Sequence, residues 1–224
     1  MTDTAGIAEQ YEFAAASFLD VVRDFSDDDW ATHVPCTPAW NARQLLSHVT
    51  GLPDDILNGR VEGAATDPWT ASQVERNAGF GVAELLERFE QQAPEAGRIL
   101  EAIGESRPPF DCHTHEHDLR HALGRPGNRD NIVISSVASQ AADSLAEVPV
   151  ALTIDFTDGP TLTVGAGGPS ATVSLTRFEY VRSRVGRRSA AQLAAYDWSG
   201  DPDGIDLAQQ SWWVFGVADH DIVE

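Results

Sequence analysis

The sequence contains no lysine: all 15 basic residues are arginine, and they stand against 35 acidic residues. Without lysine the chain can form neither a lysine Schiff base nor the lysine-bearing phosphate loop of P-loop NTPases. The formal net charge of −20 disfavours nonspecific binding to nucleic acid or to anionic membranes, because those partners are themselves negative. We therefore expect no nucleic-acid partner and no membrane partner.

Cysteine is also scarce, and long apolar runs are missing. Cys36 and Cys112 are too few for a disulfide framework or a four-cysteine zinc site, and we expect both to be reduced. No apolar run approaches the roughly 20 residues that a membrane helix needs. The first residues, from Met1 to Thr4, lack the basic and apolar parts of a secretion signal. The expected location is the cytoplasm.

Helical periodicity dominates the first 130 residues. Apolar residues recur at intervals of three and four in four long segments, and a further short helix is expected near Trp69. Asn41 and Gln44 have the spacing of a capping box at the start of the second segment. The expected long helices cover approximately residues 7–25, 42–52, 82–103 and 107–123.

Several residues are expected to interrupt these helices. Gly51 and Pro53 are expected to end the second helix, and Pro94 to kink or break the third. The acidic run 27–29 and the proline-containing segment 35–38 are expected to break the chain after the first helix. Four helices with short or medium connections predict an antiparallel four-helix bundle over residues 1–130.

Beyond residue 130 the pattern changes from helical to mixed. A helix is expected first, then strands in which apolar and polar residues alternate, with a hairpin turn at Asp158–Gly159. The predicted fold class is therefore α+β, with the bundle followed by a small mixed α/β domain over residues 131–224. The expected elements are helices 132–145, 177–184 and 189–196, strands 148–156, 162–164 and 171–175, and an aromatic tail containing Trp198, Trp212, Trp213 and Phe215.

Four of the seven histidines fall within residues 113–121 of the fourth helix. Asp111 and His115 are four residues apart, so they lie one above the other, on the same side of the helix as Leu119 and Ala122. A carboxylate that faces a core needs compensation, either from a metal ion or from an arginine or tyrosine in a polar network. A carboxylate and an imidazole in this geometry are suitable ligands for a divalent metal.

A third ligand would strengthen the metal interpretation. His48 lies on the inward face of the second helix with Leu45 and Val49, although a lone histidine on such a face is more often a hydrogen-bonded core residue. Three protein ligands that leave positions open for water or substrate are typical of a catalytic metal.

His113 and His117 are also four residues apart and form a rival pair. They lie on the opposite side of the helix, beside Arg120, and that side is polar. We therefore favour a solvated pair over a metal site there.

Three sequence elements resemble a known family. Residues 40–51 are similar to a Trp-x-x-x-[Asp/Gln]-Leu-Leu-x-His-x-x-Gly element, and residues 115–127 to His-Glu-x-Asp-[Leu/Ile]-Arg-x-Ala-Leu-Gly-x-Pro-Gly. Residues 186–189, Gln192 and the Trp198–Asp201 segment resemble the family's C-terminal domain. The family is that of mycothiol-dependent maleylpyruvate isomerase-like proteins, within the wider DinB/YfiT-like metal-binding bundles.

This resemblance implies a bundle that binds a divalent metal, often zinc, through two histidines and a carboxylate. Carried over by position, the ligands are His48, His115 and Asp111, where members with isomerase activity carry glutamate in place of Asp111. The implied activity is metal activation of a low-molecular-weight thiol, mycothiol, for addition to an electrophilic substrate. Reversible addition to a conjugated double bond would make the protein an isomerase, and release of the adduct would make it a thiol S-transferase.

Other residues receive secondary interpretations. Asp118 could hydrogen-bond a ligand histidine, Arg120 could pair with a surface carboxylate, and Glu116 could face either a groove or solvent. Arg187 and Arg188 could bind an anionic substrate or the thiol, or could instead form an interdomain salt bridge.

Two other classes of function stay open at this point. One is a non-catalytic metal-binding or regulatory protein built on the same bundle, and the other is a metal-dependent hydrolase. A monomer and a homodimer are both compatible with the sequence.

Overall fold

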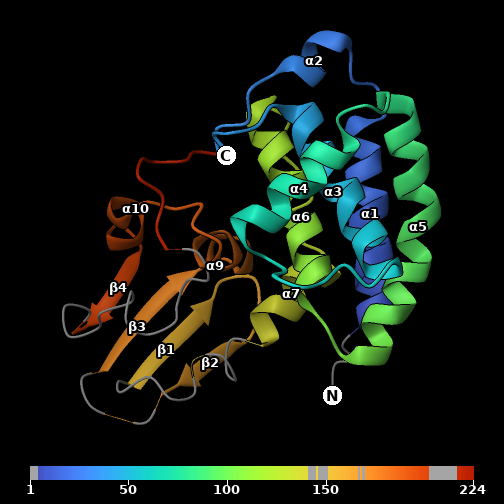
Figure 1. Cartoon of the computed structure of the whole chain (residues 1–224). Helices are drawn as coiled ribbons and strands as arrows, with labels where there is room; N and C mark the ends of the chain where they lie inside the picture. Colours follow the sequence, from blue (N-terminus) through green and yellow to red (C-terminus); the bar gives the residue numbers. More distant parts are fainter. Residues whose placement is uncertain (1–4, 141–144, 146–150, 166, 168–169, 202–215) are drawn as a thin grey trace. The chain divides into compact units, whose positions relative to one another are not determined.

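The computed structural model describes residues 5–140, 145, 151–165, 167, 170–201 and 216–224 (Figure 1). The chain divides into two compact units, residues 1–127 with residue 224, and residues 128–223. The N-terminal unit is helical, and the C-terminal unit carries the sheet. The helices of the N-terminal unit are α1 (Ile7–Val22), α2 (Asp27–Ala31), α3 (Ala42–Leu57), α4 (Asp67–Asn77), α5 (Val82–Ile103) and α6 (Arg107–Ala122).

The apolar stripes predicted from the sequence form the core of the N-terminal unit. Helix α1 packs against α5 and α6, and α3 packs against α4, α5 and α6. The rings of Phe18 and Phe89 meet edge to face at a centroid distance of 5.8 Å, which joins α1 to α5. Burial of such side chains contributes about 2 kcal/mol each, so these helices are held mainly by their shared core.

Helix α3 begins as the sequence predicts and ends later. Asn41 Oδ1 accepts a hydrogen bond from the Gln44 backbone, and the Gln44 side chain accepts one from the Asn41 backbone, which completes the capping box. The expected end at Gly51 and Pro53 is wrong, because the helix continues to Leu57. A β-carbon on Gly51 would lie 2.6 Å from Cβ of Gln73 in α4. This glycine therefore permits close packing between two helices and does not end one.

The chain does break after α1, which ends at Val22, but two other details differ from expectation, since the acidic run is helical and Pro94 does not end its helix. The acidic run 27–29 forms the short helix α2, because Ser26 and Asp29 make a reciprocal capping box. Helix α5 continues through Pro94 and ends at Gly104, which has a left-handed backbone with φ of 70°. The contacts of α5 with α1 and α3 compensate for the backbone hydrogen bond that proline cannot make.

The C-terminal unit contains a mixed four-stranded sheet in the order β2-β1-β3-β4. Strands β1 and β2 form the predicted hairpin, β1 and β3 are parallel, and β4 pairs antiparallel with β3 and was not expected. Buried Leu152, Ile154 and Phe156 alternate along β1 with more exposed residues, as predicted. The elements are α7 (Ile132–Ser139), β1 (Ala151–Phe156), β2 (Thr161–Val164), β3 (Ser170–Leu175), α9 (Arg177–Arg184), α10 (Ala190–Ala194) and β4 (Asp197–Gly200).

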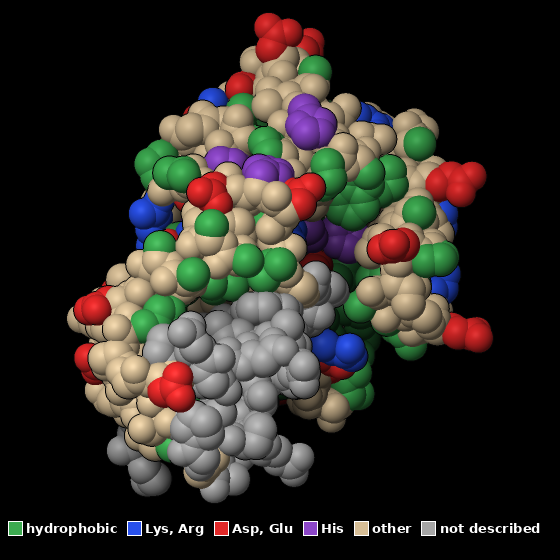
Figure 2. Space-filling model, turned by 90° about the vertical axis from the view of Figure 1, so that its left-hand side faces the viewer, with side chains coloured by type: hydrophobic (Ala, Val, Ile, Leu, Met, Phe, Trp, Pro, Cys, Tyr) green, Lys and Arg blue, Asp and Glu red, His purple; other side chains and the backbone are tan. Residues whose placement is uncertain are grey.

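The predicted α+β class, with a helical N-terminal region and a small mixed sheet after it, is confirmed. Parts of the expected helix 132–145 and strand 148–156, and the aromatic residues Trp212, Trp213 and Phe215, lie outside the described residues. Among the described helices, none combines the length and the apolar character that a membrane crossing requires. Acidic side chains are spread over the face shown in Figure 2, in keeping with the negative charge.

Candidate metal centre

Side chains from two helices of the N-terminal unit converge at one point. His48 comes from α3, and Asp111 and His115 come from successive turns of α6. His48 Nε2 lies 3.3 Å from Asp111 Oδ2, and His115 Nε2 lies 3.6 Å from Asp111 Oδ1. The three potential ligand atoms all lie within 4.8 Å of one another. The residues selected from the sequence are therefore neighbours in the fold.

These separations suit a shared cation better than direct hydrogen bonds. A nitrogen–oxygen hydrogen bond is usually about 2.7–3.2 Å long, which is shorter than both contacts. Ligand atoms bound tetrahedrally at about 2.0–2.2 Å from one ion lie about 3.4 Å apart. Two imidazoles and one carboxylate also form a donor set that zinc and similar divalent ions accept. The residues present therefore fit a divalent metal.

Each imidazole is held from behind by a second polar side chain. His115 Nδ1 lies 3.1 Å from Asp118 Oδ2, as predicted for Asp118, and His48 Nδ1 lies 2.6 Å from Gln73 Oε1. A carboxylate and an amide oxygen only accept hydrogen bonds, so each contact is a hydrogen bond when the imidazole carries its proton on Nδ1. With its proton on Nδ1, the neutral form of each ring directs the Nε2 lone pair toward Asp111.

Aromatic rings border the two histidines. The Trp40 indole lies 5.2 Å from the His48 ring and 6.2 Å from the His115 ring, and the two imidazoles meet edge to face at 5.0 Å. Trp40 immediately precedes the Asn41 cap, so the start of α3 fixes this indole. The indole thus restrains both rings against rotation.

The electrostatics of the centre depend on Asp111. Its side chain is 34% exposed, whereas His48 and His115 are buried, and the Oδ2 atom that faces His48 is itself buried. Burial by itself lowers the pKa of His48, but the neighbouring Asp111 carboxylate, helped by Gln73 and Asp55, outweighs burial and raises this pKa. A proton therefore competes with any cation for His48.

Two other groups near Asp111 stay protonated. Burial, followed by the charges of Asp111 and Glu116, raises the pKa of the Cys112 thiol well above its usual value. Burial, with charge effects from Cys112 and Asp111, likewise raises the pKa of Tyr11. Cys112 is therefore a poor nucleophile.

Comparison with known proteins identifies the family. A model of the mycothiol maleylpyruvate isomerase N-terminal domain matches residues 12–123, which include all three converging residues. The chain belongs to this family. No curated protein sequence matches it at a significant level.

Two solved structures share the fold of the chain. One is the mycothiol-dependent maleylpyruvate isomerase, at 10% identity and a TM-score of 0.50 over 80% of this chain and 88% of the other. A histidine-to-alanine mutant of such an isomerase aligns at 9% identity and the same TM-score, covering 80% and 87%. At these identities the likeness establishes the fold alone, and it extends beyond the domain that the family model covers.

The prediction that His113 and His117 are solvated is wrong. Both are buried, with Glu116 between them fully buried, and their ligand atoms also lie within 4.8 Å of one another. Glu116 accepts a 2.8 Å hydrogen bond from Arg120 Nε, and all three residues have further partners in the protein. Arg120 thus pairs with a carboxylate as expected, but with a buried one. The helical wheel failed because it ranks faces by the polarity of one helix and ignores what packs on them.

The predicted cofactor-binding arginines lie in the C-terminal unit of this family member. Arg188 is buried and forms a bidentate pair with Glu179, with both contacts at 2.7 Å. Arg187 is half-buried, and its Nη1 donates to the Val185 carbonyl. The structure therefore gives Arg188 a partner inside its own unit.

Sequence reasoning missed two residues behind His48. Gln73 in α4 accepts from His48, and its amide nitrogen donates to Asp55 Oδ2 at 2.9 Å. Asp55 follows His48 by seven residues, which is two helical turns, so its place on the same face was detectable. Nothing in the sequence pairs Gln73 with His48, because α4 meets α3 only in the tertiary structure.

Proposed function

We propose that this protein is a divalent-metal-dependent enzyme that activates mycothiol, or a similar small thiol, for addition to an electrophilic substrate. It would act as a maleylpyruvate isomerase-like isomerase or as a thiol S-transferase. The observation that carries the proposal is the convergence of His48, Asp111 and His115, each imidazole oriented by a further hydrogen bond. Family membership supports the choice of thiol and substrate class.

The three residues would hold the metal, with zinc the preferred ion for two imidazoles and one carboxylate. When bound, the metal would supply Lewis acidity that lowers the pKa of a thiol and so favours thiolate at neutral pH. His48 and His115 would contribute neutral nitrogen ligands, and Asp111 one negative charge. Three protein ligands leave positions for small molecules, and the partial exposure of Asp111 provides access.

The protein would contribute orientation and would not supply the nucleophile. The raised pKa of Cys112 disfavours an enzyme thiolate, so the attacking sulfur belongs to the small thiol. Addition of that sulfur to a conjugated carbon–carbon double bond would leave a single bond free to rotate. Elimination of the thiol would then restore the double bond in the other geometry, whereas release of the adduct would complete an S-transfer.

Arg187 and Arg188 remain proposed contacts for an anionic substrate or the thiol. Arg188 is bidentate with Glu179, and Arg187 donates to the Val185 carbonyl. Alanine at position 187 would then raise KM for the thiol by about tenfold without changing metal content, the usual consequence of losing one charge-assisted hydrogen bond.

Two measurements test the proposal. Metal analysis of protein purified without a histidine tag is expected to give about one zinc or similar ion per chain. The loaded protein is then mixed with mycothiol and either maleylpyruvate or monochlorobimane. Isomerisation or adduct formation that disappears in His48→Ala supports the proposal.

Other results would redirect or remove the proposal. Metal binding without any thiol-dependent turnover would favour a regulatory protein, and hydrolysis of esters without thiol would favour a hydrolase. Absence of metal from protein supplied with zinc, nickel, iron and manganese would refute the metal-dependent function.

A further inference from the structure

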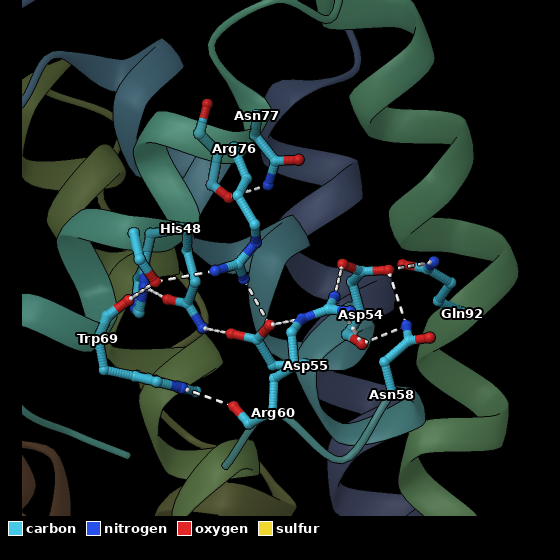
Figure 3. A network of polar contacts seen from close by, with 12 residues as sticks. His48, Asp54, Asp55, Asn58, Arg60, Trp69, Arg76, Asn77 and Gln92 are labelled. Atoms are coloured by element: carbon cyan, nitrogen blue, oxygen red, sulfur yellow. Dashed lines mark hydrogen bonds and ion pairs between the residues drawn. The ribbon is translucent and has the colours of Figure 1, made fainter. Parts of the chain in front are cut away.

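Behind His48, polar side chains form a continuous chain that ends in two arginines. His48 Nδ1 contacts the Gln73 oxygen at 2.6 Å, and the Gln73 nitrogen donates to Asp55 Oδ2 at 2.9 Å. The other oxygen of Asp55 accepts from Arg60 Nε at 2.8 Å and from Arg76. Figure 3 shows Asp55 between the two guanidinium groups, with His48 at the far end of the network.

The chemistry of Asp55 sets the direction of every hydrogen bond in this chain. An ionised carboxylate has no donor, and Asp55 accepts hydrogen bonds from both arginines. Gln73 must therefore turn its NH2 group toward Asp55 and its carbonyl toward His48. A carbonyl accepts only, so the proton of neutral His48 must sit on Nδ1 and the lone pair on Nε2. The orientation of the amide and the tautomer both follow from an acid that does not touch the histidine.

The helix that carries Gln73 is itself fixed on α3. Asn77 Nδ2 donates to the Ser47 carbonyl at 2.7 Å, and Arg43 Nη2 donates to the Ala78 carbonyl at 3.0 Å. Gly51 lacks the β-carbon that would collide with Gln73. Asp55 and Gln73 are both fully buried, so solvent does not compete for their hydrogen bonds. These contacts fix the position of the Gln73 amide relative to His48.

We propose that Gln73 and Asp55 are positioning residues of the metal centre and that they fix the Nδ1-protonated tautomer of His48. This inference rests on the proposed function for its consequence in metal binding, but the tautomer itself does not require a metal. The neutral amide of Gln73 lies between His48 and the charge of Asp55, whereas the carboxylate of Asp118 contacts His115 directly. The two ligand histidines therefore have different supports, one neutral and one anionic.

The decisive variant is Gln73→Met, which keeps the length of the side chain and removes both hydrogen-bonding groups. Metal affinity, measured by competition with a chromophoric chelator at fixed pH, is expected to fall about 10- to 100-fold. Asp55→Asn is expected to give a smaller loss of metal affinity. The asparagine can still present an oxygen to the Gln73 amide nitrogen, but its amide can also turn the other way and present its NH2 group. The matched control is Gln92→Met, since Gln92 belongs to the same network through Asp54 and touches no ligand histidine.

A second measurement reads the tautomer directly. Nitrogen-15 shifts of metal-free protein, at a pH where His48 is neutral, are expected to show Nδ1 protonated in the wild type. In Gln73→Met they are expected to show a mixture of both tautomers. A variant that loses only packing would not move this signature, and the wild type tests the inference even where a substitution prevents folding.

The outcomes separate the two proposals. A wild type that binds no metal but shows the Nδ1 tautomer refutes the proposed function and leaves the positioning role standing. A wild type with the proton on Nε2, or a Gln73→Met protein with unchanged tautomer and unchanged affinity, overturns the inference.

Discussion

Helix α6 contributes to two clusters built from the same residue types, and the clusters differ in burial and in the partners of their carboxylates. His115 and Asp111 meet His48 on one face, while His113, Glu116 and His117 gather on another. The first cluster has an accessible carboxylate and an accepting side chain behind each imidazole. The second is buried throughout, and its carboxylate accepts from Arg120.

The difference shows that spacing alone does not define a metal site. Both histidine-containing sets have helical spacing, and both place their ligand atoms within the same distance limit. A partly exposed Asp111 and a polar side chain behind each imidazole distinguish the first set, with Gln73 of α4 behind His48 and Asp118 of α6 itself behind His115. The second set is buried, and its carboxylate pairs with Arg120 of the same helix.

The largest expected effect is the loss of metal when a histidine of the first cluster is replaced. His48→Ala and His115→Ala are each expected to weaken metal binding by at least about 100-fold, because two remaining ligands hold a divalent ion poorly. His113→Ala and His117→Ala are expected to bind with unchanged affinity. Isothermal titration of the four variants checks this contrast, and equal losses in all four would contradict it.

The second cluster should instead matter for stability. Arg120→Met removes the donor to a buried carboxylate and is expected to reduce the free energy of unfolding by about 3 kcal/mol, as for other broken buried ion pairs. Arg98→Met, which breaks an exposed pair with Glu95, is the control and is expected to cost less than about 1 kcal/mol. Urea unfolding measures both, and a large drop in metal affinity in Arg120→Met would argue against the separation of the clusters.

Substitutions at Asp111 sharpen the account of the first cluster. Asp111→Glu keeps the charge and restores the longer arm found in members with isomerase activity, so metal binding is expected within about threefold of the wild type. Asp111→Asn removes the negative charge and is expected to weaken binding by about tenfold or more. Chelator competition distinguishes the two, and tighter binding by the asparagine variant would exclude Asp111 as a ligand.

The smallest expected effect is a pH dependence confined to the first cluster. The pKa of His48 is raised in the folded protein, so in metal-free protein its protonation stabilises the fold below the unfolded pKa of about 6.5. This stabilisation is lost as pH rises through the folded pKa. Metal binding has the opposite trend, because the proton must leave first. The free energy of unfolding of metal-free wild type and of His48→Gln, measured between pH 5 and 9, about the range in which histidine titrates, checks this expectation. If the two free energies depend on pH in the same way, the expectation is refuted.

Much of the fold was predictable because the local patterns agree with it. The apolar stripe on α1 follows helix periodicity, the capping box at Asn41 starts a helix, and the alternation of buried and exposed residues in β1 follows strand pleating. All three depend on residues that are near one another in the sequence. Helix α3 continues past Gly51 and Pro53, and α5 continues through Pro94, for the same reason. Packing between helices stabilises segments that local propensity would interrupt.

The three residues of the candidate centre follow from the sequence, since Asp111 and His115 share a helical face and His48 lies on an inward face of its own helix. Only the tertiary structure decided that Gln73 and Asp55 lie in one hydrogen-bonded chain behind His48, because α4 meets α3 through side chains distant in the sequence. The same holds for the burial of His113 and His117. Local spacing fixes which side chains share a face, whereas long-range packing fixes what that face meets.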